Sequence, residues 1–348
     1  MPGQLLEIAC DESGYEGEKL IGTTTDVFAH ASVHLDTESA AACMQELRRR
    51  IRSPATEYKA NHLLREKHRA VLIWLLGPLG PLSGRASVYL IDKAFFVVGK
   101  VIDLLTDRVG PTAPGFGVGQ NRQAAAMTGA LYGESRCGLD PLLWEAFLAA
   151  SNTLLRAKDP LAVRTSLASF FNTIDALRID GSGVSTDEVL RLVERAKRDP
   201  ATLRARLLDN SAIIPPLDPL IPAIVHAVIR WGDGDNPVSI VHDRQNTLSA
   251  DRIAQLKDLL SGLVPAVLSH SARGRLAGLT LVDSTVDPRV QVADILAGTA
   301  RKIASDELND RGDAELTALL RPYVDPHSIW GDDRSWALLE PTSSTRTG

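Results

Sequence analysis

The feature that most constrains the fold is an apolar run near the N-terminus that ends abruptly in two acidic residues. The run extends from Leu5 to Cys10, is interrupted only by Glu7, and is closed by Asp11-Glu12-Ser13-Gly14. A short apolar run followed by turn-forming residues predicts a buried β-strand. Acidic side chains are poor strand formers and are rarely buried unless they are paired or bind a metal. Two interpretations stay open here: a strand that ends in a solvated acidic turn, or Asp11 as the first ligand of an active site.

The composition is that of an ordinary globular protein. The chain has 348 residues, which suits one large domain with an insertion or two domains. Its hydrophobic content of 44% and charged content of 23% are typical of soluble proteins. The net charge of −5 argues mildly against a protein that coats nucleic acid, but it is compatible with an enzyme that has a local groove.

The cellular location is predicted from cysteine usage and from hydropathy. Three cysteines without metal-ligand spacing favour a reducing compartment. No signal peptide is apparent, and the apolar stretch from Ile213 to Trp231 is broken by prolines. It leaves a helix of about ten residues, whereas a membrane span needs roughly 20. We therefore expect a soluble, cytoplasmic protein with no membrane partner, and the sequence specifies no oligomeric state.

The first third of the chain predicts strands alternating with helices. Alternation over 27–35 predicts a second strand antiparallel to the first, with His30 and His34 on an exposed face rather than on a metal. Helices are expected over 37–51, 61–76 and 94–105, and a third strand over 86–91. The arginines at 48–50 and 52 suit the C-terminal end of a helix dipole, and they equally suit contacts with phosphates.

The rest of the chain predicts a helical block followed by further strands. From 106 to 234 the pattern is helical without a clear strand, and Ser185 with Glu188 suggests a capping box. Strands are expected over 238–242 and 276–282, and a helix from Asp287-Pro288 to about Leu308. We therefore predict an α/β core from residues 1–105 and 235–308, a helical insertion over 106–234, and a C-terminal extension over 309–348 with a disordered end.

Carboxylates stand at the ends of the predicted strands. Asp11-Glu12, Asp243 and Asp283 each follow a strand, whereas Asp92 has Lys93 next to it as a possible partner. Ligands bind outside the C-terminal ends of parallel strands in open sheets. Gln291 and Asp294 share one face of a nearly all-apolar helix, so Asp294 is either a structural residue or a ligand. Carboxylates gathered without positive partners repel one another, and binding of Mg²⁺ or Mn²⁺ relieves that repulsion.

These motifs resemble a known family. DESG after a strand, Glu57-x-Lys59, VSIVHDRQ, VDS and QVADILAG are similar to the bacterial domain-of-unknown-function family 3800. The resemblance covers about residues 5–105 and 235–305, and it implies an RNase H-like mixed sheet flanked by helices, with a large all-helical insertion. The family is RNase H-like, as in metal-dependent nucleases. This implies Asp11, Asp243 and Asp294 as metal ligands.

The resemblance also ranks the other candidates and shows one departure. Glu12 is a further catalytic candidate, and Glu57, Lys59, Asp283 and Gln291 are candidates for supporting the site or contacting substrate. RNase H-like proteins usually have three meandering strands before the first helix. Here a pair of helices follows the second strand, which puts the role of Glu57 in doubt.

The preferred hypothesis is a Mg²⁺- or Mn²⁺-dependent nuclease that hydrolyses phosphodiester bonds in RNA or DNA. Lys59, Lys93 or the arginines at 48–52 would then contact phosphates. The alternative hypothesis is a non-catalytic RNase H-like module that binds a protein or a nucleic acid, with structural acids. The acidic pI of about 5.9 favours the alternative slightly, whereas the acids at the strand ends favour the enzyme.

Overall fold

A mixed five-stranded sheet flanked by helices forms the centre of the molecule. The computed structural model describes residues 4–52, 58–106, 122–179, 187–209, 215–232, 236–263 and 275–341. Within these ranges the strands are β1 (Leu6–Ser13), β2 (Val27–Val33), β3 (Ala86–Asp92), β4 (Pro237–Asp243) and β5 (Arg275–Val282). Their order is β3-β2-β1-β4-β5, in which β1, β4 and β5 are parallel and β2 is antiparallel to both of its neighbours. The predicted α/β class with a mixed sheet is confirmed.

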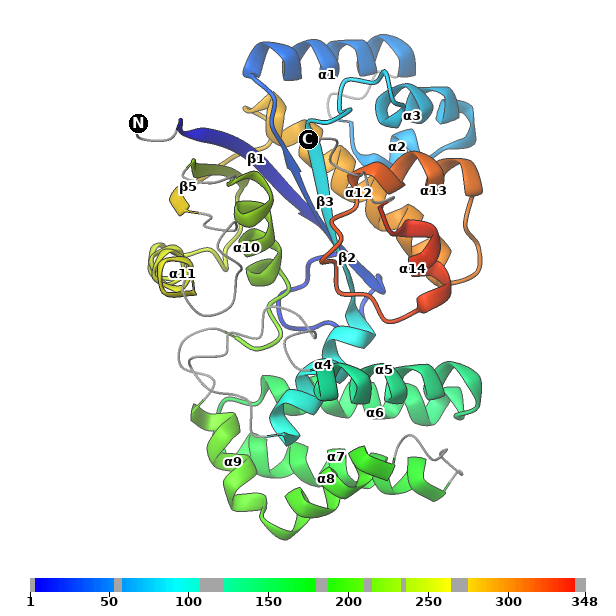
Figure 1. Ribbon diagram of the computed structural model, residues 1–348, viewed down its shortest axis with the longest axis vertical. Helices are drawn as coiled ribbons and strands as arrows, with labels where there is room; N and C mark the ends of the chain where they lie inside the picture. Colours follow the sequence, from blue (N-terminus) through cyan, green and yellow to red (C-terminus); the bar gives the residue numbers. More distant parts are fainter. Residues whose placement is uncertain are drawn as a thin grey trace.

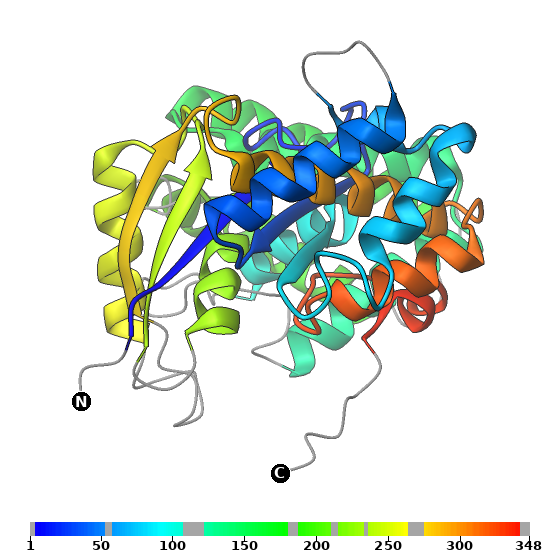
Figure 2. The ribbon, with the colours of Figure 1, turned by 90° about the horizontal axis from the view of Figure 1, so that it is seen from above.

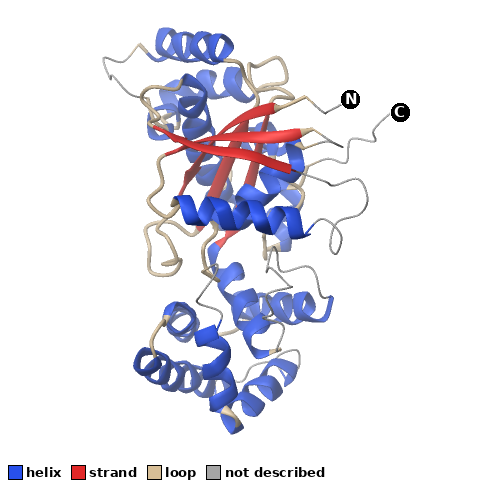
Figure 3. Cartoon of the chain, turned by 90° about the vertical axis from the view of Figure 1, so that its left-hand side faces the viewer, coloured by secondary structure: helices blue, strands red, loops and turns tan. Residues whose placement is uncertain are grey.

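Both faces of the sheet are covered, so the alternating residues of the central strands are buried on either side. Ile8 and Cys10 of β1 face one core together with Phe28 of β2, and the helix α10 (Leu220–Trp231) covers that face. Ala9 of β1 faces the other core with Ala29 and Ala31 of β2, and the helix α12 (Pro288–Leu308) covers it. Figure 3 shows helices on both sides of the strands. We call these the α10 face and the α12 face.

The α12 helix runs alongside β1 in the same direction. Asp287 caps it by accepting a hydrogen bond from the Arg289 amide, and Pro288 occupies the first turn, as expected from the sequence. Arg289 forms an ion pair with Glu7 near the start of β1, and Arg301 Nε donates to Ser13 Oγ at its end over 2.9 Å. Twelve helical residues rise about 18 Å and six strand residues about 20 Å, so the two elements stay in contact over this length.

The predicted helix over 61–76 is interrupted, which corrects the sequence prediction. The segment forms α2 (Ala60–Leu63), a 3₁₀ turn η1 (Glu66–His68) and α3 (Arg69–Leu76), after α1 (Thr37–Ile51). Arg65 has extended backbone angles between α2 and η1. The break has a packing reason, because α2 lies on α12, whereas Arg69 of α3 pairs with Asp313 and Glu315 beyond α12.

The residues after α12 complete the α12 face and the outer edge of β3, which the sequence did not predict. They form α13 (Ala314–Leu320), a 3₁₀ turn η4 (Arg321–Tyr323) and α14 (Asp333–Leu339). Between η4 and α14 the chain runs beside β3, where the Ile329 amide donates to Leu90 O and the Asp92 amide donates to Ile329 O, each over 2.8 Å. This segment therefore protects an edge strand that would otherwise expose unpaired backbone groups.

The described residues between β3 and β4 form helices and no strand. They are α4 (Lys93–Leu105), α5 (Arg122–Cys137), α6 (Pro141–Arg156), α7 (Pro160–Ile179), α8 (Asp187–Arg198), α9 (Pro200–Asp209) and α10, and α11 (Ala250–Leu263) follows β4. In Figure 1 the helices α4 to α9 lie below the sheet, at the end where β3 leads into α4, whereas α10 lies against the sheet. The predicted cap at Ser185 lies outside the described residues.

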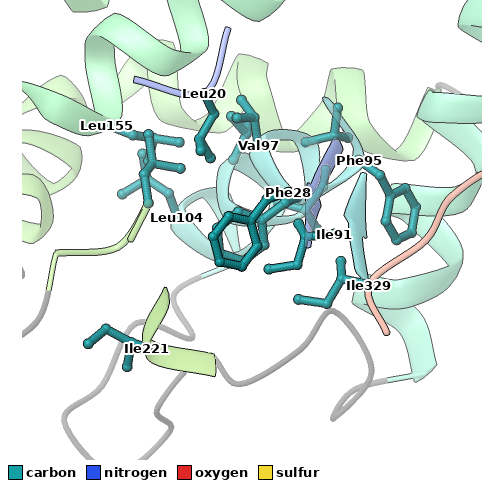
Figure 4. Packing of buried hydrophobic residues seen from close by; sticks show 14 of the residues in the cluster. Leu20, Phe28, Ile91, Phe95, Val97, Leu104, Leu155, Ile221 and Ile329 are labelled. Carbon is teal, nitrogen blue, oxygen red and sulfur yellow. The ribbon is translucent and has the colours of Figure 1, made fainter. Parts of the chain in front are cut away.

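The lower helices are joined to the sheet by a continuous core and by hydrogen bonds. Figure 4 shows buried side chains from the sheet, the β1–β2 loop, α4, α6 and α10 in this cluster, among them Leu20, Phe28, Ile91, Val97, Leu104, Leu155 and Ile221. The Asn152 side chain of α6 accepts a hydrogen bond from the Leu20 amide and donates to Glu18 O. The helical group therefore abuts the loop that follows the C-terminal end of β1. Among the described residues, no helix is long and apolar enough to cross a membrane.

Candidate active site

Asp11 and Asp243 are neighbours at the C-terminal end of the parallel pair β1–β4. Cys10 lies opposite His242 in this pair, so the next residues, Asp11 and Asp243, lie at the same level and point toward the same face. Asp11 shares that face with Ala9, whose side chain is buried against the α12 core. Both carboxylates therefore point toward α12. Asp11 is only 5% exposed, although it lies at the end of its strand.

Asp294 projects from α12 toward the same place. Gly298 and Arg301 follow it on one helical face, because spacings of four and seven residues return to the same side of a helix. That face meets the end of β1, since Arg301 bonds Ser13 and a Cβ on Gly298 would lie 3.8 Å from Ser13 Oγ. The carboxylate of Asp294 accordingly acts electrostatically on that of Asp11. The sheet and the last long helix thus bring together three acids that are distant in sequence.

The charges of this cluster and its burial favour protonated carboxyls in the metal-free protein. Burial raises the pKa of Asp11 to about 9, and the nearby charges of Glu12, Asp294 and Asp243 act in the same direction. Burial likewise raises the pKa of Glu12 to about 8, against an opposing hydrogen bond from Gln245. The aspartates are not packed into a single-ion cage, because the one described group of three His, Cys, Asp or Glu with ligand atoms all within 4.8 Å of each other lies elsewhere. Their wider spacing suits a pair of ions, which lie about 4 Å apart in two-metal sites.

Glu12 points to the α10 face, where it meets two buried histidines that the sequence analysis did not place in the site. Its Oε1 accepts a hydrogen bond from the Gln245 amide, and its Oε2 lies 3.6 Å from His242 Nε2. His30 Nε2 lies 3.2 Å from the same His242 nitrogen. The prediction that His30 lies on an exposed face is wrong: it is 1% exposed because α10 covers this face of the sheet.

The hydrogen-bond partners determine the protonation of this histidine pair. Burial lowers the pKa of His30 well below its ordinary value and that of His242 to about 4, so both imidazoles are neutral near pH 7. His242 Nδ1 lies 2.9 Å from the Asp243 carbonyl oxygen, which only accepts, so Nδ1 carries the proton. His242 Nε2 is then an acceptor and receives the Nε2 proton of His30. Glu12 Oε2 consequently gains no donor from His242, and it is buried without a hydrogen-bond partner in the described structure.

The loop between β5 and α12 supports Asp243. The Ser284 amide donates to Asp243 Oδ1 over 2.9 Å, and the Gln291 side chain donates to Thr285 O over 3.2 Å. Asp283 accepts hydrogen bonds from the Thr285 amide and hydroxyl, and these bonds lower its pKa. Asp283 is exposed and serves this turn, and its charge is not among those acting on Asp11. Gln291 and Asp283 therefore shape the loop that orients Asp243.

The basic candidates divide into those near the acids and those held elsewhere. Lys59 is exposed and directly precedes Ala60, which packs against Gly298 beside Ser13. Lys93 is buried, and its ammonium donates to Thr23 and Thr25 rather than pairing with Asp92, which caps α4. The expected Asp92–Lys93 pair and phosphate contact by Lys93 are therefore wrong. Of the arginines in α1, Arg49 and Arg50 pair with Glu46, and Glu57 lies outside the described residues.

The close approach of α2 to α12 makes Gly298 a test of this geometry. A Cβ at Gly298 would lie 2.5 Å from Ala60 Cβ, so Gly298→Ala must displace α2. We expect the substitution to lower the free energy of unfolding by about 1–3 kcal/mol, as overpacking does. Gly129→Ala in α5 is the control, because its Cβ would meet nothing within 4 Å and alanine favours a helix by about 1 kcal/mol. Urea unfolding of both variants measures the difference, and equal stabilisation by both would contradict the close packing.

Comparisons of the chain with protein-family models, with curated proteins and with solved structures found no significant match.

Proposed function

We propose that the chain is an RNase H-like, metal-dependent nuclease whose ligands are Asp11, Asp243 and Asp294. The observation that carries the proposal is the convergence of carboxylates from β1, β4 and α12 at the C-terminal end of the central parallel strand pair. The strand order 3-2-1-4-5, with only the second strand reversed, supports the RNase H-like assignment. The long α12 after the last strand supports it too, because such proteins carry an acid on their last helix.

The donor set suits Mg²⁺ or Mn²⁺. These cations prefer oxygen ligands, and the cluster offers carboxylates whose mutual repulsion a cation would relieve. Glu12 Oε2, buried without a hydrogen-bond partner among the described residues, adds a further oxygen on the other side of β1. When bound, divalent ions would activate water and stabilise the charge of a phosphodiester under attack.

The protein's own residues would hold and orient this site. The Ser284 amide fixes the Asp243 carboxylate, and Gln291 fixes the loop that carries Ser284. Gln245 and the His30–His242 pair set the position of Glu12. Lys59 and Arg301 lie beside Ser13 at the rim of the acids, and we assign them to phosphate contacts with RNA or DNA.

A matched pair of variants tests the proposal. Asp243→Asn removes a carboxylate from the cluster, whereas Asp283→Asn removes one from the end of the adjacent strand without touching the cluster. Calorimetric titration with Mn²⁺ is expected to show stoichiometric binding to the wild type and to Asp283→Asn, with at least tenfold weaker binding to Asp243→Asn. Cleavage of single-stranded and duplex RNA and DNA in Mn²⁺ should follow the same order.

Two results would overturn the proposal. Equal Mn²⁺ affinity in both variants would mean that Asp243 is not a ligand. Stoichiometric Mn²⁺ binding without cleavage of any of the four substrates would favour the non-catalytic RNase H-like binding module.

A further inference from the structure

A second group of potential metal ligands lies at the outer edge of the sheet. It consists of His226 on α10 and of Asp325 and His327 in the segment between η4 and α14. Candidate ligand atoms of the three side chains all lie within 4.8 Å of one another. Among the described residues this is the one group of three or more His, Cys, Asp or Glu that meets this criterion. Figure 2 shows the sheet and its covering helices from above.

The backbone on either side of the group is held by regular hydrogen bonds. The Asp325 amide donates to Val88 O and the Ile329 amide donates to Leu90 O, so the segment is joined to β3 at two points. The His327 amide donates to Asp325 Oδ1 over 2.8 Å, which orients the buried carboxylate. The His226 ring stacks on the ring of His327 at 5.3 Å. Two elements that are about one hundred residues apart in sequence therefore present their side chains to a common point.

Tyr89 provides an independent sign that a ligand binds at this point. It is 3% exposed, and its ring stacks on that of His226 at 4.7 Å. Its hydroxyl oxygen is buried without a hydrogen-bond partner in the described part of the chain, which is costly for a phenol. The charge of Asp325 acts on this hydroxyl, which places the hydroxyl beside the carboxylate. A bound ion with a water molecule would give the hydroxyl a partner.

The ligand types select the kind of ion. Two imidazoles and one carboxylate are borderline donors that suit Zn²⁺, whereas Mg²⁺ prefers oxygen ligands alone. Two ligands that are each about 2.0–2.1 Å from a tetrahedral ion stand about 3.3 Å apart. His327 Nδ1 lies 3.3 Å from Asp325 Oδ1, which is the separation that such an ion requires. Three protein ligands leave a fourth position for water or for a small ligand.

We propose that His226, Asp325 and His327 bind a Zn²⁺ ion that ties α10 to the segment covering β3. The site is separate from the acidic cluster, because Tyr89 and His226 lie on the α10 face, whereas Asp11 points to the α12 face. It also differs from that cluster in metal preference. The inference therefore does not depend on nuclease activity and stands or falls by its own experiment.

The test measures zinc binding to the full chain. The protein is treated with a chelator, loaded with Zn²⁺, dialysed and analysed for metal content by mass spectrometry. His327→Ala is the main variant, because His327 is exposed and its loss leaves no buried cavity. His34→Ala is the matched control, because it removes another exposed histidine from outside the group. Asp11→Asn serves to distinguish the two sites.

The expected result is one Zn²⁺ per chain in the wild type, His34→Ala and Asp11→Asn, and at least a tenfold loss of affinity in His327→Ala. Zn²⁺ should raise the melting temperature of the first three proteins, because a ligand that binds only the folded state stabilises it. Co²⁺ substitution should give the visible absorption bands of a four-coordinate site in the same three proteins. His327→Gln repeats the test with a polar side chain, in case the alanine variant folds poorly.

Two outcomes would overturn the proposal. Wild-type protein that retains no zinc after dialysis would mean that Asp325 merely caps a turn and pairs with His327. Unchanged zinc affinity in both His327 variants would mean that the ion binds elsewhere.

Discussion

Asp11→Asn is expected to reduce Mg²⁺- or Mn²⁺-dependent cleavage of nucleic acid by orders of magnitude while leaving the metal-free protein as stable or more stable. The substitution keeps the shape of the side chain and removes one anionic ligand. Activity should fall because the metal supplies both the nucleophile and the charge stabilisation. Stability should hold because Glu12, Asp294 and Asp243 all disfavour a charge on Asp11. Cleavage rates and thermal melting in a chelator measure the two effects.

A structural role for Asp11 predicts the opposite pattern. Its Oδ1 accepts a hydrogen bond from the Glu12 amide over 2.7 Å, and loss of such a charge-assisted bond costs about 1.5–3 kcal/mol. Asp294→Asn should behave like Asp11→Asn, and the double variant should be little worse than either single one, because ligands of one site act as a unit. If both single variants melt early and metal changes nothing, the carboxylates are structural and the nuclease proposal fails.

The central part of the fold was predictable because its signals are local. Strand ends marked by Asp11 and Asp243 follow apolar runs, and the cap at Asp287 with Pro288 marks the start of α12. The parity of residues along each strand then places the aspartates on one face once β1 and β4 are paired. Pairing itself is a long-range property, and the sequence supplied it only as a condition.

The environment of Glu12 was not predictable for a related reason. His30 alternates with small and apolar residues, a pattern typical of a strand with one exposed face. Burial of His30 depends on α10, which comes almost two hundred residues later. Lys93 shows the same limitation, since its partners Thr23 and Thr25 lie in a loop far from it in sequence. Polar residues inside the sheet thus depend on covering elements that local patterns do not reveal.

The group of His226, Asp325 and His327 gave only a faint signal. Asp325 and His327 are two residues apart, but His226 lies within an apolar helix that carries no metal-binding motif. The segment 324–329 also lacks the alternation of a strand, although it pairs with β3 through isolated bridges. Its position follows from the unpaired edge of β3, which is known only when the strand order is known.

The stability of the metal-free protein is expected to fall as the pH rises from about 6.8 to about 8. Asp11 and Glu12 have folded-state pKa values of about 9 and about 8, above their ordinary values of 3.8 and 4.5. Between the ordinary and the raised values, the folded state holds a proton that the unfolded state has lost. Stability therefore decreases with rising pH, by about 1.4 kcal/mol per pH unit for each such group. Total stabilities are about 5–15 kcal/mol, so the loss should be large in urea unfolding.

The pH window and the controls separate this effect from other titrations. His30 and His242 have lowered pKa values, so they destabilise the folded state only as the pH falls below about 6.5, outside the window. Asp11→Asn should make the slope shallower, whereas Asp283→Asn should leave it unchanged because the pKa of Asp283 is lowered. Saturating Mn²⁺ should reverse the slope, since protons then compete with the cation for the same carboxylates. A wild-type slope of zero in chelator, or a slope that Asp11→Asn does not alter, would show that these carboxyls are already ionised in the folded protein.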